Sequence, residues 1–260
     1  MSNLRVVVIG ASGKMGRAII QGLSKEADIT IVGGIDVHNL GEDIGKLAGI
    51  LPLGILVTNQ LEQVLLKEKP NAVIDFTHRL AAQKNIPLVL KNGISVVAGT
   101  TGFDETDLNK FEQLALENKT SIFLAPNFSL GAVLMMKFAQ IASKYYQQSE
   151  IIEYHNDQKV DSPSGTALAT AKKIAVNLPQ KELKTETACR GGDFAGVKIH
   201  SVRLQSMVAH QEVLFAGKGE VLTIRHDSFS RESFLPGILL ALRKVHNWQG
   251  LKVGLEEILE

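Results

Sequence analysis

Apolar, β-branched runs alternate with amphipathic stretches through the first half of the chain. The runs predict strands at Leu4–Ile9, Ile29–Ile35, Ile55–Thr58, Ala72–Phe76, Ser95–Ala98 and Ser121–Leu124. The stretches between them predict helices at Met15–Ser24, Leu61–Lys67, Leu80–Asn92 and Glu105–Asn118. Several of the strands are apolar throughout, as expected for strands that are covered on both faces. The alternation therefore predicts an α/β fold with right-handed crossovers and a doubly wound, Rossmann-type parallel sheet.

The pattern changes near residue 129. Helices are predicted at Leu130–Tyr146 and Ser164–Leu178, with a strand at Glu150–His155 between them. Three further strands at Lys198–Gln205, Met207–Phe215 and Glu220–His226 have short connections, which predict antiparallel pairing. A helix at about Arg231–Val245 and the segment Leu255–Leu259 close the chain. We therefore expect a dinucleotide-binding domain at 1–128 and an α+β domain with a mainly antiparallel sheet at 129–231. Residues 232–260 are expected to pack back on the first domain.

Composition and charge narrow the class of protein. The 260 residues include 28 Lys+Arg against 27 Asp+Glu, and this formal net charge of +1 predicts no general attraction to nucleic acid or to a membrane. The single cysteine, Cys189, cannot form an internal disulfide, and the seven histidines are scattered, so no metal site is predicted. The sequence shows neither a signal peptide nor a membrane-length apolar run, so a cytoplasmic location is expected.

The strongest local motif is the glycine-rich turn after the first predicted strand, Gly10-Ala11-Ser12-Gly13-Lys14-Met15-Gly16. Gly10 allows a tight turn, Gly13 allows a pyrophosphate to approach the backbone, and Gly16 allows close packing of helix on strand. The N-terminus of the helix that follows favours an anion. The spacing is G-x-x-G-x-x-G instead of the usual G-x-G-x-x-G, so a purely structural turn is the alternative.

Asp36 strengthens the nucleotide interpretation. It follows the second predicted strand, about 20 residues beyond the glycines, where dinucleotide-binding folds place an acid for the adenosine ribose. Three later loops also follow predicted strands: Phe76-Thr77, Gly99-Thr100-Thr101-Gly102 and Ala125-Pro126-Asn127-Phe128. Because ligands bind beyond the carboxyl ends of the strands in an open parallel sheet, we expect these loops to converge on one crevice.

A second candidate site lies in the polar stretch EYHNDQKVDSPSGTA, residues 153–167. His155 and Lys159 are both candidate proton donors. Free N–H groups and hydroxyls that suit a carboxylate are expected at the start of the helix, from Ser164, Gly165 and Thr166. A solvated polar loop with a good helix cap is the alternative.

These motifs and their order resemble the dihydrodipicolinate reductase family, the 4-hydroxy-tetrahydrodipicolinate reductases of diaminopimelate and lysine biosynthesis. The similarity covers essentially the whole chain and is carried by VVVIGASGKMG, VIDFTHR, VAGTTGF, APNFSLG, EYHNDQKVDSPSGTA and SFSRESFLPG. The resemblance implies reduction of a cyclic imine dicarboxylate with NADH or NADPH, in which the protein supplies orientation and a proton. It also implies a homotetramer built through the sheet of the second domain.

The resemblance also assigns roles to individual residues. Its nucleotide-contacting positions are Gly10, Ala11, Ser12, Gly13, Lys14, Met15, Asp36, Gly99, Thr100, Thr101, Ala125, Pro126, Asn127 and Phe128. Its acid/base pair falls on His155 and Lys159, and its substrate-carboxylate loop on Gly165 and Thr166. We favour Lys159 as the proton donor, because an ammonium group also attracts the dicarboxylate before it gives up its proton.

Two departures from the family pattern affect binding. Asn156 stands at a substrate contact where the family usually has a second His, and it can donate a hydrogen bond but cannot carry charge. Val37 follows the ribose acid where the family often has Arg, so it offers no cation to a 2′-phosphate. Since Asp36 also repels that phosphate, we expect NADH to be used at least as well as NADPH.

Two other functions remain open from the sequence. A dehydrogenase of a small amino acid such as aspartate would share the first domain, although Lys159 and residues 164–166 argue against it. A nucleotide-sensing protein that has lost catalysis would account for Asn156, although the retained His155 and Lys159 argue against that.

Overall fold

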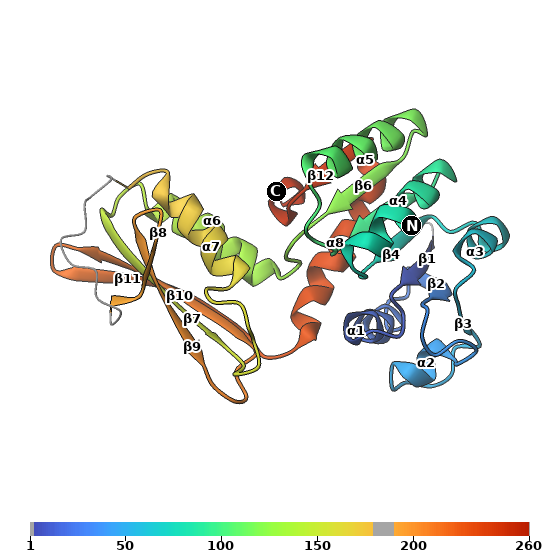
Figure 1. Cartoon of the computed structure of the whole chain (residues 1–260), viewed down its shortest axis with the longest axis horizontal. Coiled ribbons are helices and arrows are strands. Elements are labelled where there is room, and N and C mark those ends of the chain that lie inside the picture. Colours follow the sequence, from blue (N-terminus) through green and yellow to red (C-terminus); the bar gives the residue numbers. More distant parts are fainter. Residues whose placement is uncertain (1–2, 179–189, 260) are drawn as a thin grey trace. The chain divides into compact units, whose positions relative to one another are not determined.

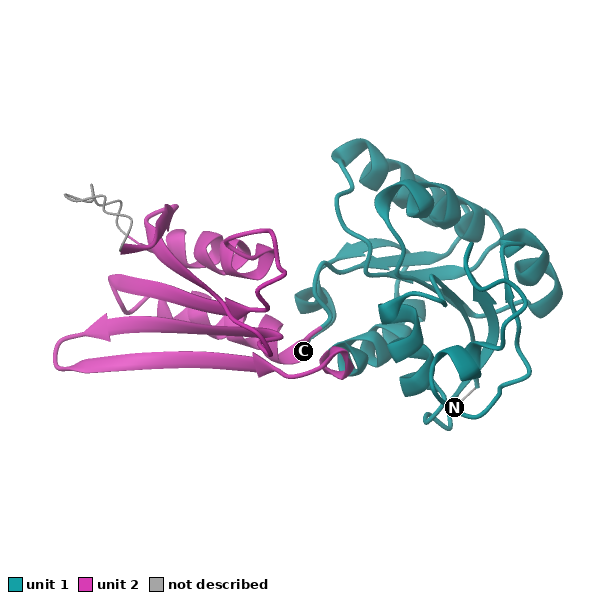
Figure 2. Cartoon of the chain, turned by 60° about the horizontal axis from the view of Figure 1, so that its bottom comes forward, with its two compact units in different colours: residues 1–128, 234–260 teal, residues 129–233 magenta. Residues whose placement is uncertain are grey.

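The chain folds into two compact units, which Figure 2 shows in teal and magenta. The computed structural model describes residues 3–178 and 190–259, so the single cysteine, Cys189, lies outside the described residues. Unit 1 comprises residues 1–128 and 234–260, and unit 2 comprises residues 129–233.

Unit 1 is built on a seven-stranded sheet with the order β12-β6-β5-β4-β1-β2-β3 (Figure 1). The strands are β1 (Leu4–Ile9), β2 (Ile29–Ile35), β3 (Val57–Thr58), β4 (Ala72–Asp75), β5 (Ser95–Ala98), β6 (Ser121–Leu124) and β12 (Gly250–Val253). All neighbouring strands in this sheet are parallel, which confirms the predicted doubly wound architecture. The strand order reverses between β1 and β4, the position at which open α/β sheets bind ligands.

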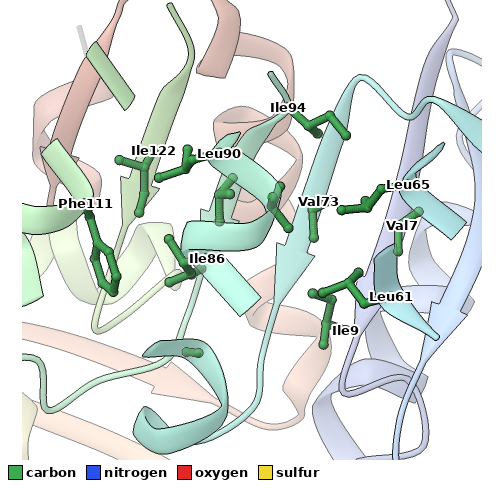
Figure 3. Close-up of a cluster of buried hydrophobic side chains, with 14 of the residues drawn as sticks. Val7, Ile9, Leu61, Leu65, Val73, Ile86, Leu90, Ile94, Phe111 and Ile122 are labelled. Carbon is green, nitrogen blue, oxygen red and sulfur yellow. The ribbon is translucent and has the colours of Figure 1, made fainter. Parts of the chain in front are cut away.

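Helices cover both faces of this sheet. They are α1 (Lys14–Leu23), α2 (Ile44–Leu47), α3 (Leu61–Glu68), α4 (Arg79–Lys91), α5 (Glu105–Glu117) and α8 (Leu235–Lys244), with 3-10 turns η3 (Val245–Asn247) and η4 (Leu255–Ile258). On one face, side chains of α3, α4 and α5 pack on alternate strand residues, as Figure 3 shows for Ile86, Phe111 and Val73. Val6 and Val8, which point the other way along β1, are also fully buried. Burial on both faces explains why the second half of β1, Val6–Ile9, is continuously apolar.

Two elements of unit 1 were not predicted from the sequence. Strand β12 has the sequence GLKV, in which only Gly250 is buried, so it has no continuous apolar run. Its strand character comes from parallel pairing with β6, whose residues lie far away in the sequence. Helix α2 has only four residues and depends on Asp43, whose carboxylate accepts bonds from the N–H groups of Gly45 and Lys46. Neither a strand defined by pairing with a distant segment nor a helix of four residues leaves a periodic pattern in the sequence.

Unit 2 holds a five-stranded mixed sheet with the order β11-β10-β7-β9-β8. Its strands are β7 (Gln148–His155), β8 (Gly192–Phe194), β9 (Val197–Arg203), β10 (Ala209–Gly217) and β11 (Glu220–Ser228). Strands β7 and β10, β10 and β11, and β8 and β9 pair antiparallel. The mainly antiparallel sheet is therefore confirmed.

The strands near 198–205 and 207–215 run antiparallel to each other, as predicted, but they are not paired with each other. Strand β9 pairs in parallel with β7, with Glu153 opposite Ser201 and His155 opposite Arg203. Strand β10 pairs with the other edge of β7, so β7 lies between two strands that are consecutive in the chain. The short link between β9 and β10 therefore passes the end of β7, because β7 already occupies the position beside each of them.

Helices α6 (Leu130–Ala142) and α7 (Gly165–Ala175) of unit 2 are shorter than predicted. Helix α6 ends at Ser143, since the chain must turn before β7 begins at Gln148. The predicted helix at Arg231–Val245 is also divided: residues 231–234 form the 3-10 turn η2 (Arg231–Phe234), and α8 starts at Leu235. Pro236 explains this start, since proline fits the first turn of an α-helix but not its interior.

Candidate active site

The turn after β1 requires glycine at two positions. Gly10 has a φ angle of +84°, and a Cβ atom there would lie 2.8 Å from the carbonyl oxygen of Phe76. A Cβ atom at Gly16 would collide with the carbonyl oxygen of Gly10 and the backbone of Ala11. Because these neighbours are backbone atoms, they cannot move aside as a flexible side chain could. The turn therefore brings the start of α1 directly against the end of β1.

The N-terminus of α1 is open to an anion. Gly13 takes the N-cap position in an extended conformation, and among the described residues no side chain caps it. The first turn of α1 contains no acidic residue, and Gly13 and Lys14 are exposed. Unpaired N–H groups at a helix start, with no competing carboxylate, fit a pyrophosphate group. The residues present thus fit a bound dinucleotide.

Asp36 is held beside this turn by backbone hydrogen bonds. Its Oδ2 accepts a bond from the N–H of Ser12 at 2.9 Å, and its Oδ1 accepts bonds from Val37 and His38 at 2.8 and 3.0 Å. The carboxylate is therefore fixed at the end of β2, where a ribose acid is expected. Val37 next to it is 73% exposed and uncharged.

A buried carboxylate, which the sequence reasoning missed, joins two of the predicted loops. Asp75, the last residue of β4, is 1% exposed. Its Oδ1 accepts bonds from the hydroxyl of Thr77 at 2.6 Å and the hydroxyl of Thr100 at 3.2 Å, and its Oδ2 accepts one from Asn85 at 3.0 Å. An acid at the end of an apolar strand was the signal that could have identified it. Asp75 fixes the loops after β4 and β5 relative to each other.

Aromatic packing adds the loop after β6 to the same edge of the sheet. The rings of Phe76 and Phe128 have centroids 5.4 Å apart, and Phe128 is 1% exposed. A Cβ atom at Gly99 would collide with the ring of Phe76, so glycine allows the ring to pack against the backbone at this position. The structure therefore brings together, within unit 1, all the segments that hold predicted cofactor residues: 10–15, Asp36, 99–101 and 125–128. Of these residues, Phe128 and Thr100 are buried, whereas Thr101 and Pro126 are exposed.

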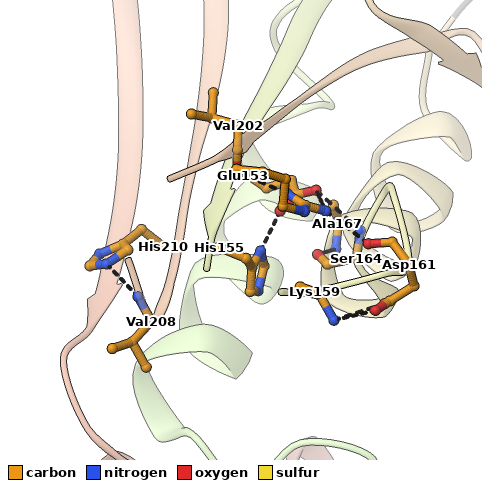
Figure 4. Close-up of polar contacts among 10 residues, drawn as sticks. Glu153, His155, Lys159, Asp161, Ser164, Ala167, Val202, Val208 and His210 are labelled. Carbon is orange, nitrogen blue, oxygen red and sulfur yellow. Dashed lines mark hydrogen bonds and ion pairs between the residues drawn. The ribbon is translucent and has the colours of Figure 1, made fainter. Parts of the chain in front are cut away.

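The second group of predicted residues lies in unit 2, at the end of β7 (Figure 4). His155 is the last residue of this strand, and its Nδ1 contacts a carboxylate oxygen of Glu153. Arg203 on β9 donates to both oxygens of that carboxylate, at 2.8 and 3.0 Å. Burial alone would raise the pKa of Glu153, but hydrogen bonds from His155, Arg203 and Ser201 lower this pKa to about 2. Glu153 is therefore anionic near neutral pH.

Lys159 forms an ion pair in the loop after β7. Its Nζ lies 2.7 and 2.8 Å from the two carboxylate oxygens of Asp161, and the hydrogen bond from Lys159 lowers the pKa of Asp161. The Lys159 side chain is 28% exposed and that of Asp161 is 60% exposed. Asn156 uses its side-chain oxygen to accept a bond from the N–H of Gln158 at 3.1 Å. Because both side chains of this ion pair are partly exposed, a dicarboxylate from solvent can reach the ammonium group of Lys159.

The start of α7 matches only part of the prediction. Ser164 is the N-cap, is 3% exposed, and accepts a bond from the N–H of Ala167 at 3.2 Å. Its own N–H donates to Glu153 at 3.3 Å, so the prediction of a free N–H at Ser164 is wrong. Gly165 is exposed, and a Cβ atom there would meet nothing within 4 Å. The helix thus begins at Gly165, an exposed position at which an added side chain would meet no neighbour.

Two negative findings apply to residues 3–178 and 190–259. No three His, Cys, Asp or Glu side chains gather there in a way that could hold a metal ion. None of the helices there has the length and apolar content needed to cross a lipid bilayer.

Comparison with known proteins identifies the family. Residues 4–128 match the model for the N-terminal part of dihydrodipicolinate reductase, and residues 131–259 match the model for its C-terminal part. The chain belongs to the dihydrodipicolinate reductase family. Members of this family are pyridine-nucleotide-dependent oxidoreductases of lysine and diaminopimelate biosynthesis.

Curated relatives of the same family match over nearly their full length. The 4-hydroxy-tetrahydrodipicolinate reductase of Carboxydothermus hydrogenoformans is 48% identical over 98% of this chain and 99% of its own. That of Moorella thermoacetica is 46% identical over 100% of this chain and 99% of its own.

Solved structures also resemble the chain in fold. A dipicolinate-bound dihydrodipicolinate reductase from Paenisporosarcina sp. TG-14 superposes with a TM-score of 0.88, at 38% identity and full coverage of both chains. An amine dehydrogenase from Mycobacterium smegmatis superposes with a TM-score of 0.69 at 13% identity, covering 96% of this chain and 95% of its own. The second likeness shows a shared fold and nothing about substrate.

Proposed function

We propose that the chain catalyses the reduction of 4-hydroxy-tetrahydrodipicolinate to tetrahydrodipicolinate with NAD(P)H. The observation that carries the proposal is the grouping of His155, Lys159 and the start of α7 in unit 2, in a chain whose unit 1 has a dinucleotide-type turn. The Paenisporosarcina relative is described as dipicolinate-bound, and dipicolinate resembles the proposed product in having one ring and two carboxylates.

Substrate binding is assigned to the start of α7 and to Lys159. The N–H groups of Gly165 and Thr166 lie at the start of α7, and together with the Thr166 hydroxyl they suit one carboxylate of the substrate. The ammonium group of Lys159 attracts the dicarboxylate, which competes with Asp161 for it. Asn156 donates a neutral hydrogen bond where the family usually provides a charge, which weakens binding without changing the reaction.

Proton delivery is assigned to Lys159, with His155 positioned beside the same loop. A general acid must give a proton to the anion that develops when the ring is reduced, and an ammonium at the carboxylate site can do so. When bound, NAD(P)H supplies the hydride. The glycine turn at 10–16, Asp36, and the loops at 99–101 and 125–128 hold the dinucleotide and orient it.

The test follows nicotinamide absorbance with purified protein, NADH and enzymatically generated 4-hydroxy-tetrahydrodipicolinate. We expect oxidation of NADH that depends on both protein and substrate. Reduction of NAD⁺ with aspartate, but no reaction with the cyclic substrate, would indicate an amino-acid dehydrogenase instead. NADH binding without turnover of either substrate would indicate a nucleotide-sensing protein. Either of the last two results contradicts the proposal.

The carboxylate assignment predicts the effect of Thr166→Val. This change keeps the shape of the side chain but removes its hydroxyl, leaving the substrate's anion without one donor. KM for the cyclic substrate should rise about tenfold, the equivalent of roughly 1.4 kcal/mol lost from a charge-assisted hydrogen bond. The Kd for NADH, measured by fluorescence titration, should stay within about twofold. A change in that Kd with an unaltered KM would contradict the assignment, because Thr166 would then act on the cofactor and not on the substrate carboxylate.

The environment of Asp36 predicts the cofactor preference. Its fixed negative charge repels a 2′-phosphate, and Val37 offers no cation in return. Lys14 and His38 are exposed and compensate only in part, through contacts that salt screens. The ratio of kcat/KM for NADH over NADPH should be at least about one at low salt and should increase at physiological salt.

Val37→Arg is the matched variant for this preference. It should raise kcat/KM for NADPH by about tenfold through bidentate phosphate binding and leave kcat/KM for NADH nearly unchanged. A preference of the wild-type protein for NADPH that survives added salt would mean that other residues form a phosphate site.

We expect the chain to form a homotetramer. The face of the unit 2 sheet that lies opposite its buried face is assigned as the contact between chains. Val213 and Phe215 of β10 point to the buried face, so Leu214 and Glu212 between them point to the other. On β11, Val221 belongs to this second face and is 64% exposed. Light scattering coupled to size-exclusion chromatography should give a mass near four chains, and Val221→Asp should lower it. A wild-type monomer at micromolar concentration would contradict the assignment.

A further inference from the structure

Glu153 is a fully buried acid beside the candidate site of unit 2. The proposed reaction assigns no role to its carboxylate. Its side chain is 0% exposed, and it lies on β7 two residues before His155, so both point to the same face of the sheet. Burying an ionised carboxylate is costly unless its oxygens are all paired. Such a group persists only where the surrounding contacts satisfy it, so its partners indicate what it does.

One partner of Glu153 is the imidazole of His155. The Glu153 Oε2 contacts the Nδ1 of His155, as the dashed line in Figure 4 shows. Because an anionic carboxylate can only accept, this contact places a proton on Nδ1. The neutral imidazole then carries its lone pair on Nε2, and the ring cannot rotate without losing the bond.

The other partners connect Glu153 to the start of α7 and to the loop that carries Lys159. The Oε1 accepts from the N–H of Ser164 at 3.3 Å, which is the residue that caps α7. Arg203 donates to both oxygens of Glu153 and also to the carbonyl oxygen of Asp161 at 2.8 Å. Arg203 thus neutralises the buried charge and ties down the segment between Lys159 and Ser164.

We propose that Glu153 is a positioning residue that fixes both the tautomer of His155 and the start of α7. This role rests on the proposed function, since it matters only if His155 and the start of α7 take part in the reaction. The carboxylate touches neither substrate nor cofactor in this role. It acts by holding the His155 imidazole and the carboxylate-binding start of α7 in one fixed arrangement.

The direct test is ¹⁵N NMR of the histidine side chains in the full-length protein, with His155→Asn used to assign the signal. At a pH at which the imidazole is neutral, wild-type His155 should be the Nδ1–H tautomer. Glu153→Gln should shift it to a mixture with the Nε2–H form. A wild-type Nε2–H tautomer would overturn the proposal whether or not the protein reduces the proposed substrate.

Kinetics of the same variant separate positioning from general destabilisation. Glu153→Gln should lower kcat by at least about tenfold and raise the Kd of dipicolinate, while the Kd of NADH stays within about twofold. Glu220→Gln is the matched control, since Glu220 is the first residue of β11 in the same unit and accepts a hydrogen bond from the Tyr146 hydroxyl at 3.0 Å. It should leave all three values nearly unchanged.

Two results would overturn the positioning role in an active enzyme. The first is Glu153→Gln with a wild-type kcat and a wild-type Kd for dipicolinate. The second is a folded Glu153→Gln protein that loses NADH and dipicolinate binding equally, because a positioning role in unit 2 predicts a loss of dipicolinate binding alone. If Glu153→Gln does not fold, Glu153→Asp keeps the charge but withdraws it from His155, and the same shift in tautomer is then expected. If the wild-type protein shows no turnover at all, the proposed function fails while the NMR test of Glu153 still stands.

Discussion

Lys159→Ala should lower kcat by roughly two to four orders of magnitude and leave the Kd for NADH almost unchanged. The reason is that the variant loses both the proton donor and the cation that attracts the dicarboxylate. Removing Lys159 also leaves Asp161 without its ion-pair partner at 2.7 Å, which adds a repelling charge near the substrate's carboxylates. Steady-state kinetics with the cyclic substrate and fluorescence titration with NADH measure the two quantities separately.

Lys172→Ala is the matched control for this prediction, because Lys172 is an exposed lysine in the last turn of α7. It should keep kcat within about twofold of the wild-type value. A Lys159→Ala enzyme that retains more than about half of the wild-type kcat would exclude Lys159 as the donor. If His155→Ala reduces kcat far more than Lys159→Ala does, the donor role belongs to His155.

Gly16→Ala should weaken NADH binding by at least about 30-fold, which corresponds to roughly 2 kcal/mol of overpacking and lost contacts. The added methyl group would collide with backbone atoms of Gly10 and Ala11, so the turn itself must move. A displaced turn no longer presents the start of α1 to a pyrophosphate. Isothermal titration calorimetry with NADH measures the change, and thermal unfolding should show a lower Tm.

Gly13→Ala provides a contrast within the same motif. A Cβ atom at Gly13 would lie 3.3 Å from the carbonyl oxygen of Gly10, a close contact that a small shift relieves. Its Tm should therefore stay near the wild-type value, while NADH binding weakens because a methyl group at this position would keep a pyrophosphate from approaching the backbone. Unchanged NADH affinity in both variants would mean that the glycines make a turn and nothing more.

Sequence patterns predicted unit 1 well where strands are buried on both faces. β1 and β5 have the predicted bounds, because each has an apolar, β-branched centre and is followed directly by a glycine. β12 was missed, since its residues after Gly250 are partly exposed and its identity comes from pairing with β6. Pairing between distant segments is not encoded in local periodicity.

In unit 2 and its candidate site, too, local sequence patterns did not show which distant segments lie together. Short loops suggested that consecutive strands pair, but β7 separates β9 from β10. The sequence pointed to His155 and Lys159 as chemical groups, and to Ser164 as the start of a helix. It did not reveal that Arg203, on a strand 48 residues beyond His155, completes the environment of Glu153. Alternation along β7 could have paired Glu153 with His155, whereas the contribution of β9 required the parallel register.

The most direct test of the central claim is the fate of the hydride. With NADH deuterated at the transferable C4 position, the account predicts that one deuterium enters a ring carbon of the product for each NADH oxidised. Mass spectrometry of the product should then show a gain of about one mass unit relative to the reaction with unlabelled NADH. Product that forms without deuterium, or NADH that is oxidised without a matching amount of reduced product, would contradict the account.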